Sequence, residues 1–414
     1  MIPDFPNIRH IRVFAQTVHH GSVSMAAAQC NLSQPAATQA IAKLETALET
    51  PLLLRGAGGL RATQAGALFA RRVDTALALL ASGARAALRL GAPAKASKRA
   101  FDHQITAAQL RALVAVGNSG SFTVAAHDLG LSQPSVHRAA RTLEAVAGLA
   151  LFNATAVGVE LTPPAQVLAA RVKLAAAELR QGLEEISLAR GEENSSIVIG
   201  SMPLARTRIV PAAINDMIHA SPSTQMRVVE GRYPELLRSL REGDIDCLIG
   251  ALREPAPADD VTEEVLFDDP IEIVAGPRHP LVGKRNISLE DCLAYPWIAP
   301  PRETPAGQYI YNTLKIQELA QTPVRVVSSS LVVLRGLLGL GDYLTLISRQ
   351  QIAVEEHTGM IVPLDVRLEG NRRAIGLTVR SAWRPTDRQA QFIDLLRKHA
   401  SHNPSIATWL KLPQ

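Results

Sequence analysis

An internal repeat constrains this chain of 414 residues more than any other feature of its sequence. The segment GSVSMAAAQCNLSQPAATQAIAKLE begins at Gly21 and the segment GSFTVAAHDLGLSQPSVHRAARTLE begins at Gly120, so a gapless shift of 99 residues relates them. Between residues 12 and 80 this shift gives 22 identities in 69 positions. Alanine richness explains some of these matches, but not GS, AA, LSQP and LE in one register. The chain therefore carries the same module twice, and we call the two copies the first and the second repeat.

Each repeat has the signals of two helices joined by a short turn. In the first repeat Ser22 is placed to cap a short helix, because its hydroxyl can accept a hydrogen bond from an amide of the first turn. Asn31 stands where that helix must end, and it tolerates the left-handed conformation of a tight turn. Ser33 then caps a second helix, with Pro35 in the first turn, where a missing N–H costs nothing. The second repeat has the same residues 99 positions later, with glycine in place of Asn31, so both repeats are predicted to form a helix-turn-helix.

A short segment with turn residues and then a long helix follow each predicted helix-turn-helix. Residues 52–63 and 151–162 fit a small β-hairpin, or wing, and residues 64–90 and 163–190 fit long helices. Apolar side chains recur at helical spacing in two stripes, formed by Phe69, Val73, Ala76 and Leu80 and by Leu168, Val172, Ala175, Ala176, Leu179, Leu183 and Ile186. Such a stripe needs a partner helix. We expect the stripes to join subunits, with packing on the chain's own core as the alternative.

The basic residues gather in the first repeat. Residues 1–100 hold 12 Lys and Arg against 4 Asp and Glu, residues 101–190 hold 7 of each, and the remaining 224 residues hold 24 against 27. The net charge of +5 therefore comes from the first hundred residues. A local basic field favours a polyanion such as nucleic acid, and a merely solubilising surface is the alternative.

Composition limits the class of protein. With 47% apolar and 20% charged residues the chain can form cores, which excludes wholesale disorder. No uninterrupted apolar run reaches the roughly 18 residues that cross a bilayer, and the first residues lack the pattern of a secretory signal. Cys30, Cys247 and Cys292 are few, odd in number and far apart, which favours reduced thiols over disulfides. We therefore expect a cytoplasmic protein with no membrane contact.

From Ile197 onward the pattern changes to strands that alternate with helices. Apolar runs rich in β-branched residues occur at 197–201, 226–230, 246–252, 271–276, 324–329, 344–348 and 374–380. Such alternation predicts parallel sheets flanked by helices, in a region long enough for two small α/β lobes. Two stretches have the composition of linkers, the flexible and basic GAPAKASKRA at 91–100 and GEENSS at 191–196.

The repeated motif resembles a known family. The N-terminal domain of LysR-type transcriptional regulators is similar to this module in three features. These are the motifs GS, AA, LSQP and LE, a wing that ends in T-x-x-G from Thr63 to Gly66, and a long helix after the wing. Ordinary members carry one copy, so this chain departs from the usual architecture. LREGDIDCLIGA, VLFDDPIEIVAG and PRHPL at 277–281 resemble the effector-binding domain of that family. The segments at 201–207 and 228–253 are similar to the subgroup around the galactose-binding-protein regulator.

The resemblance implies two all-α-dominated winged helix-turn-helix domains and then an α/β two-lobed effector domain of the periplasmic-binding-protein-like (type 2) fold. The expected first domain is 1–64, followed by a linker helix and flexible basic linker at 65–100. The second winged helix-turn-helix is expected at 101–162, and a linker or dimerisation helix at 163–192. The effector-binding domain is expected at 195–400, with a C-terminal tail at 401–414.

The second helix of a helix-turn-helix presents its N-terminal residues to base edges in the major groove of double-stranded DNA. The outward positions that we expect to do so are Gln34, Pro35, Thr38, Gln39 and Lys43 in the first repeat and Gln133, Pro134, His137, Arg138 and Arg141 in the second. Contacts to the phosphate backbone are expected from Arg9, Arg12, Arg55 and Arg61.

The two repeats have diverged in these positions. The second repeat has Arg138, where the family usually has arginine, whereas the first has Gln39. The second repeat also lacks the basic wing, because Ala154 and Glu160 stand where the first has arginine. We expect both repeats to contact DNA, the first with more phosphate binding. The alternative is a second repeat that serves only as a spacer or dimerisation unit.

A small-molecule effector is expected in the crevice outside the carboxyl ends of the strands. The residues that we expect to line it are Ser201, Met202, Leu204, Arg206, Pro301, Thr304, Ser328 and Ser329. Amides after Ser201 could hold an anionic group, to which Arg206 could add charge. Exposure of Arg206 on a helix, with no ligand contact, is the alternative.

No enzyme motif occurs in the sequence. G-x-S-x-G, a P-loop, HExxH and paired CxxC are absent, and the 11 histidines lack the spacing of metal ligands. We therefore predict no catalytic residue, metal or cofactor, although a carboxylate pair would leave no sequence signal. A solute receptor of the transport type is a further alternative, but it would need a signal peptide. The prediction is a ligand-responsive transcriptional regulator, a homodimer or homotetramer, with RNA polymerase as a further candidate partner.

Overall fold

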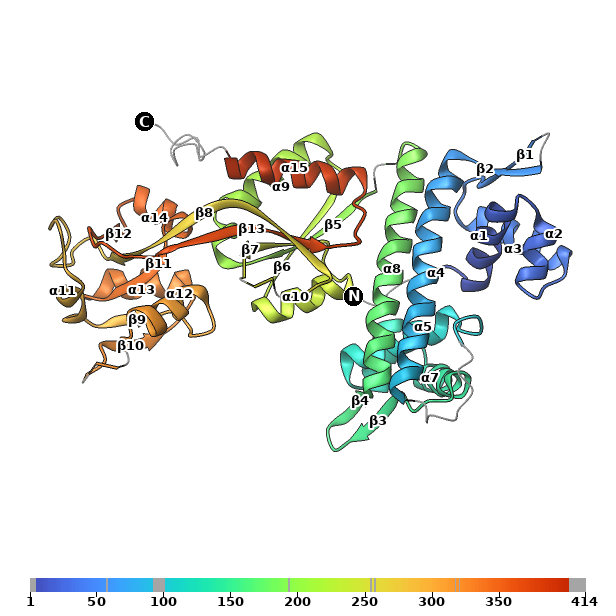
Figure 1. Cartoon of the computed structure of the whole chain (residues 1–414), viewed down its shortest axis with the longest axis horizontal. Helices are drawn as coiled ribbons and strands as arrows, with labels where there is room; N and C mark the ends of the chain where they lie inside the picture. The colour runs from blue at the N-terminus through green and yellow to red at the C-terminus, as the bar shows by residue number, and fades with distance from the viewer. Residues whose placement is uncertain are drawn as a thin grey trace. The chain divides into compact units, whose positions relative to one another are not determined.

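The computed structural model describes residues 5–56, 59–91, 101–192, 194–253, 255–256, 258–316, 318–319 and 321–401. The chain divides into two compact units. The first unit consists of the residues up to 196 with the short segments 223–225 and 238–245, and the second consists of the other residues from 197 onward (Figure 1). Residues 92–100 of the predicted linker and residues 402–414 of the predicted tail lie outside the described residues.

Within the described residues, each repeat folds into three helices and a two-stranded antiparallel hairpin, in the same order. The elements of the first repeat are α1 (Ile8–His20), α2 (Val23–Gln29), α3 (Gln34–Ala47), β1 (Leu53–Gly56) and β2 (Gly59–Ala62). The elements of the second are α5 (Ala107–Ser119), α6 (Phe122–Leu129), α7 (Gln133–Ala147), β3 (Phe152–Thr155) and β4 (Gly158–Leu161). The predicted long helices follow the hairpins as α4 (Gln64–Gly91) and α8 (Pro163–Ala189).

The predicted capping residues begin these helices. The hydroxyl groups of Ser22 and Ser33 each accept a hydrogen bond at 3.4 Å from the backbone amide three residues further on. The equivalent serines of the second repeat make the same bonds. Asn31 has a φ of 53° and Gly130 a φ of 63°, the left-handed conformation predicted for both. The helix ends were predictable because these signals are local.

A repeated glutamate holds each hairpin against its helix. Glu45 Oε1 accepts hydrogen bonds from the backbone amides of Leu52 and Leu53 at 2.7 and 3.0 Å. Glu144 Oε1 accepts from the equivalent two amides of the second repeat at 2.8 and 3.2 Å. The glutamate of the LE motif therefore positions the hairpin in both repeats.

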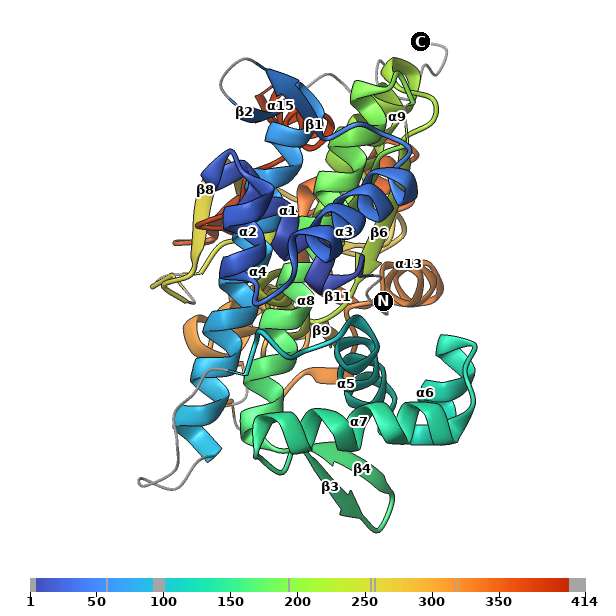
Figure 2. The ribbon, with the colours of Figure 1, turned by 90° about the vertical axis from the view of Figure 1, so that its right-hand side faces the viewer.

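The two long helices pack along each other (Figure 2). All residues of the two predicted stripes are buried except Leu183, which is half-buried against the same core. Each stripe therefore covers the other within one chain. The structure shows the alternative, in which both stripes pack on the chain's own core. They are not left exposed to join subunits, because this apolar surface is already removed from water inside the chain.

The second unit contains a sheet of nine strands among the described residues. Its strands are β5 (Ser196–Ser201), β6 (Gln225–Glu230), β7 (Cys247–Ala251), β8 (Val261–Ala275), β9 (Trp297–Ala299), β10 (Val324–Val327), β11 (Leu344–Ser348), β12 (Val362–Pro363) and β13 (Arg372–Arg380). The order is β10-β9-β11-β8-β13-β7-β5-β6, with β12 also paired to β8. Its helices and single turns are η1 (Pro203–Arg206), α9 (Ile209–Ala220), the first half of α10 (Tyr233–Glu242), α11 (Leu289–Leu293), α12 (Pro305–Gln308), η2 (Tyr309–Thr313), α13 (Leu331–Leu340), η3 (Arg349–Ile352), α14 (Ala353–His357) and α15 (Asp387–Ser401). The second half of α10 belongs to the first unit.

The prediction of parallel sheets holds only in part. β5 is parallel to β7, and β9 is parallel to both β10 and β11. β8 and β13 run antiparallel to each other, β8 also to β11 and β13 also to β7. The run predicted at 271–276 is the second half of the 15-residue strand β8, which the apolar pattern alone did not join to its first half.

These two antiparallel strands connect two lobes. One core surrounds Ile199, Ile249 and Phe392, and the other surrounds Trp297 and Leu346. The first half of β8 pairs with β13 beside β7, and its second half pairs with β11. The unit therefore has one lobe on each side of the β8–β13 pair, in agreement with the two predicted α/β lobes.

Candidate nucleic-acid interface and ligand cavity

The N-terminal side of α3 is a polar, exposed surface. Its apolar residues Ala37, Ile41 and Leu44 are buried, which turns the opposite side of the helix outward. All five predicted base-contacting residues of this helix are exposed: Gln34, Pro35, Thr38, Gln39 and Lys43. The structure thus brings them together on one face.

The equivalent side of α7 is exposed as well, but two of its residues are already engaged. Gln133, Pro134, His137, Arg138 and Arg141 are all exposed. Arg141 donates to Glu144 Oε2 at 2.6 Å and to His137 Nε2 at 3.4 Å. Arg141 therefore already contacts Glu144 through Nη1 and His137 through Nε within the same helix.

The predicted phosphate-contacting arginines occupy different surroundings. Arg9 is exposed in the first turn of α1, and Arg55 and Arg61 are exposed on the β1–β2 hairpin. Arg61 lies opposite Leu54 and Arg55 opposite Leu60, so the two arginines point to opposite faces of the hairpin. Arg12 is half-buried instead.

Arg12 contacts the second repeat's segment rather than solvent. It donates to the backbone oxygen of Asp102 at 3.2 Å and to the Asp102 carboxylate at 3.4 Å. This contact spans 90 positions of the sequence, and no local pattern announces it. The structure therefore does not bring Arg12 onto the same exposed surface as Arg9.

Two cations of the first repeat act on the imidazole of His10 in α1. Burial, then the charge of Lys43 and then the charge of Arg9 lower the pKa of His10. A positive charge disfavours the protonated imidazole, as burial does. In the second repeat the hairpin positions equivalent to Arg55 and Arg61 are exposed but carry alanine and Glu160. The two surfaces therefore share a shape and differ in charge.

A cavity lies between the lobes of the second unit. It is lined by Met202, Pro203, Leu204, Ala251, Pro300, Thr304, Pro305, Ala306, Ser328, Ser329, Leu334, Thr345, Leu346, Ile347, Ser348, Gln351 and Arg373. Five of the eight predicted effector residues are among them: Met202, Leu204, Thr304, Ser328 and Ser329. They follow the strands β5, β9 and β10, as the strand-end argument predicts.

The other three predicted effector residues do not line this cavity. Ser201 is fully buried and donates to the carbonyl of Met202 at 3.3 Å. Arg206 forms an ion pair with Glu230. Pro301 uses its carbonyl oxygen to accept the hydroxyl of Thr304 at 2.7 Å.

The charged residue of the cavity was missed from the sequence. Arg373 lines it and donates to Asp269 Oδ2 through Nε at 3.1 Å and through Nη2 at 3.0 Å. Ser348 donates to Asp269 Oδ1 at 2.7 Å. Burial raises the pKa of Asp269, while Arg373 and Ser348 oppose the shift. Asp269 on β8 and Arg373 on β13 are direct partners in the antiparallel register, a pairing over 104 positions that no local pattern reveals.

The cavity has the chemistry of a site for a small polar molecule. Its lining combines the polar residues Thr304, Ser328, Ser329, Ser348 and Arg373 with apolar residues. Within the described residues, no three His, Cys, Asp or Glu side chains gather as metal ligands. No helix in that part of the chain is long and apolar enough to cross a membrane.

Two family models match the chain. The model for the LysR substrate binding domain matches residues 190–401, and the model for the bacterial regulatory helix-turn-helix protein of the lysR family matches residues 8–67 and 107–166. This protein belongs to the LysR family of transcriptional regulators. As a LysR-family member it is a DNA-binding regulator with an effector-binding domain, not an enzyme, and the solute-receptor alternative has no support.

Two relatives show how the repeat affects similarity within the LysR family. The HTH-type transcriptional regulator GalR from Pseudomonas putida is 31% identical over 380 residues, 91% of this chain and 93% of GalR. PcaQ from Agrobacterium fabrum is 26% identical over 285 residues, 69% of this chain and 92% of PcaQ. The match to GalR covers so much of this chain that it must include at least part of each repeat. The match to PcaQ leaves uncovered a part of the chain that is long enough to contain one whole repeat.

Solved structures of LysR-family proteins share the fold. A full-length OxyR variant from Pseudomonas aeruginosa has a TM-score of 0.53 at 21% identity and covers 71% of this chain and 93% of its own. CbnR, a LysR family transcriptional regulator, has a TM-score of 0.50 at 18% identity and covers 71% of this chain and 99% of its own. These identities support a common fold and no more.

Proposed function

We propose that both repeats are winged helix-turn-helix domains that bind operator DNA together. The observation that carries the proposal is the pair of helices α3 and α7, each capped by a serine, with the apolar side buried and the N-terminal polar side exposed. Base contacts are assigned to the ten predicted residues of these two helices. Glutamine suits an adenine edge and arginine a guanine edge in the major groove.

Because the two repeats differ in charge, we assign them different contacts with DNA. Arg9, Arg55 and Arg61 are assigned to phosphate contacts, because all three are exposed on the first repeat. Arg12 is assigned to the contact with Asp102 instead. The second repeat lacks the hairpin arginines and is expected to contribute mainly through α7.

The test uses a duplex that the full chain selects from a random library. The double variant Arg55→Ala with Arg61→Ala is expected to reduce the slope of log affinity against log salt by up to about 2, since each phosphate contact contributes about 0.9. The reciprocal variant Glu160→Arg places a cation in the second hairpin and is expected to steepen the slope of log affinity against log salt. An unchanged slope in the double variant would remove the first hairpin from the interface.

A second variant decides whether the second repeat binds DNA. Arg138→Ala with Arg141→Ala is expected to weaken binding and to shorten the protected region of the duplex. Unchanged affinity and protection would favour the alternative, in which the second repeat is a spacer or dimerisation unit.

The cavity between the lobes is our candidate for the effector site. Its five predicted residues and Arg373 suit a small acid or a hydroxylated molecule such as a sugar derivative. A thermal-shift screen of metabolites against the full chain tests this, because a ligand of the folded state raises its melting temperature. A compound that stabilises the native chain and an Arg373→Gln chain equally would argue against a charge contact in this cavity.

The remaining partners follow from the family. RNA polymerase is proposed because a transcriptional regulator acts on transcription, and the cytoplasm is proposed because the operator lies there. Homodimer or homotetramer formation stays a prediction. Since α4 and α8 cover each other, such assembly would use other surfaces.

A further inference from the structure

We infer that one chain carries a complete two-module DNA-binding unit, held together by its own α4–α8 pair, and that its operator consists of two unlike half-sites in inverted orientation. The operator half of this inference rests on the proposed function. The pairing half rests on contacts within the first unit alone.

The contacts between α4 and α8 exchange under the repeat shift. A β-carbon at Gly83 would lie 2.8 Å from the β-carbon of Arg171, and one at Gly182 would lie 3.0 Å from that of Arg72. Gly182 and Arg171 stand 99 positions after Gly83 and Arg72. When position a of one copy contacts position b of the other, and b also contacts a, the copies are related by a two-fold axis. Here that axis relates two parts of one chain.

The contacts at the ends of the helix pair also exchange under the repeat shift. Arg190 Nη1 contacts Thr50 Oγ1 at 3.5 Å, and a β-carbon at Gly91 would lie 3.0 Å from Leu149. Gly91 and Leu149 are the repeat equivalents of Arg190 and Thr50. Each module also packs on its own long helix, α1 on α4 and α5 on α8. The approximate axis therefore relates α3 to α7, and two helices related in this way meet half-sites in inverted orientation.

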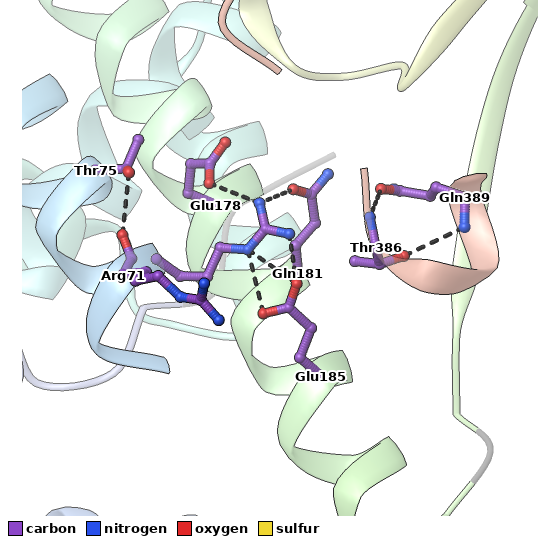
Figure 3. A network of polar contacts seen from close by, with 8 residues as sticks. Arg71, Thr75, Glu178, Gln181, Glu185, Thr386 and Gln389 are labelled. Atoms are coloured by element: carbon purple, nitrogen blue, oxygen red, sulfur yellow. Dashed lines mark hydrogen bonds and ion pairs between the residues drawn. The ribbon is translucent and has the colours of Figure 1, made fainter. Parts of the chain in front are cut away.

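A buried ionic cluster is specific for the pairing of unlike helices. Glu178, Gln181 and Glu185 of α8 surround one guanidinium of α4 (Figure 3). That guanidinium belongs to Arg72, which is 6% exposed and donates to Glu178 at 3.0 Å and to Gln181 at 2.9 Å. The cluster is an asymmetric addition to an otherwise symmetric contact.

Two copies of α4 could not form this cluster. The positions of α4 equivalent to its three α8 members are Leu79, Ser82 and Ala86. An α4–α4 pair would therefore bury Arg72 beside no acid, at a cost that an α4–α8 pair avoids. Arg171, the α8 equivalent of Arg72, faces the neutral side of α4 and is exposed. Because both helices belong to one chain, their pairing also benefits from a high effective concentration.

The two half-sites must differ because the two recognition surfaces do. Thr38 and Gln39 of α3 correspond to His137 and Arg138 of α7. A glutamine and an arginine at one position prefer different bases. A single chain would therefore recognise a degenerate palindrome rather than a perfect one.

Disulfide trapping tests the pairing in the full chain. Gly83→Cys with Arg171→Cys is expected to give an intrachain bond on oxidation, once the β-carbons move apart from 2.8 Å to the roughly 3.5–4.5 Å of a disulfide. The bond is seen as a faster-migrating monomer without reductant. An equal mixture of the two single variants is expected to give no more covalent dimer than the native chain, whose own cysteines serve as the control. Covalent dimer in the mixture would overturn the pairing, because it requires helices of different chains. Gly91→Cys with Leu149→Cys, joined by a short thiol-reactive cross-linker because the atom of Leu149 at 3.0 Å is Cδ2 rather than the β-carbon, is the second pair, should the first disturb folding.

Duplex selection tests the operator. The full chain is expected to select two unlike inverted half-sites, with one chain for each pair of half-sites by native mass spectrometry. Gln39→Arg is expected to make the half-sites more alike, with at least a tenfold gain for the perfect palindrome. Identical half-sites for the native chain, or two chains for each pair, would overturn the inference. Failure to select any duplex would overturn the DNA-binding proposal, while the disulfide result would still decide the pairing.

Discussion

At the residue scale, Arg72 is the side chain on which the pairing of α4 with α8 most depends. Burial opposes its charge, but hydrogen bonds to Glu185 and Glu178 more than compensate and raise its pKa. The guanidinium is therefore charged in the core, and removing it would leave two carboxylates without their cation.

Arg72→Met is expected to destabilise the first unit by about 3–5 kcal/mol for that reason. The measurement is hydrogen exchange of α4 and α8 in increasing urea. Arg171→Met, at the equivalent position of the second repeat, is the matched control and should change stability by less than about 0.5 kcal/mol, because Arg171 is exposed. Equal losses in the two variants would contradict a special role for the buried cluster.

Arg373→Leu is expected to destabilise the second unit in a pH-dependent way. Burial already raises the pKa of Asp269, and loss of Arg373 removes the charge that opposes this shift. Above the folded-state pKa the variant must bury an unpaired carboxylate, and below it a neutral acid that costs less. The loss of stability is therefore expected to be largest near about pH 8 and to shrink toward about pH 5.

The control for the Arg373→Leu variant is Arg372→Leu, which removes an exposed arginine from the same strand. Urea unfolding of the second unit, followed by Trp fluorescence at both pH values, should show no such pH-dependent loss in the control. A loss in Arg373→Leu that grows on acidification would contradict the assignment to Asp269.

At the element scale, the hairpins depend on a glutamate of the preceding helix. Glu45→Ala removes the acceptor of two backbone amides and is expected to cost the β1–β2 hairpin about 1–3 kcal/mol. The amides of Leu52 and Leu53 should then exchange faster, and the salt dependence of DNA binding should weaken as Arg55 and Arg61 lose their position. Glu45→Gln keeps an oxygen acceptor and should restore most of the protection. Unchanged exchange in the alanine variant would show that the hairpin is held by other contacts.

At the scale of the whole molecule, two compact units predict two unfolding transitions. Arg72→Met should lower only the transition of the first unit, and Arg373→Leu only that of the second. Selected duplex DNA should raise the first, and a cavity ligand the second. Calorimetry of the full chain tests this. A single transition that moves as a whole in both variants would mean that the units unfold cooperatively.

Local signals in the sequence were enough to predict the modules. Serine caps, the left-handed Asn31 and the periodic stripe of the long helices act over three to seven residues, so the sequence shows them directly. The exposed faces of α3 and α7 followed from the same periodicity. Five of the residues that we expected to contact an effector line the cavity, because they directly follow strands, where α/β proteins bind ligands.

The sequence by itself determined the repeated module, the ends of its helices and the need of each long helix for an apolar partner. Only the tertiary structure decided which helix that partner is, since a stripe specifies burial but not identity. It also decided that Arg72 meets the acids of α8, that Arg12 meets Asp102 and that Arg373 meets Asp269. The reason is physical: helix signals act between neighbours in the chain, whereas each of these charges finds its partner about a hundred positions away, where only the packed chain brings them together.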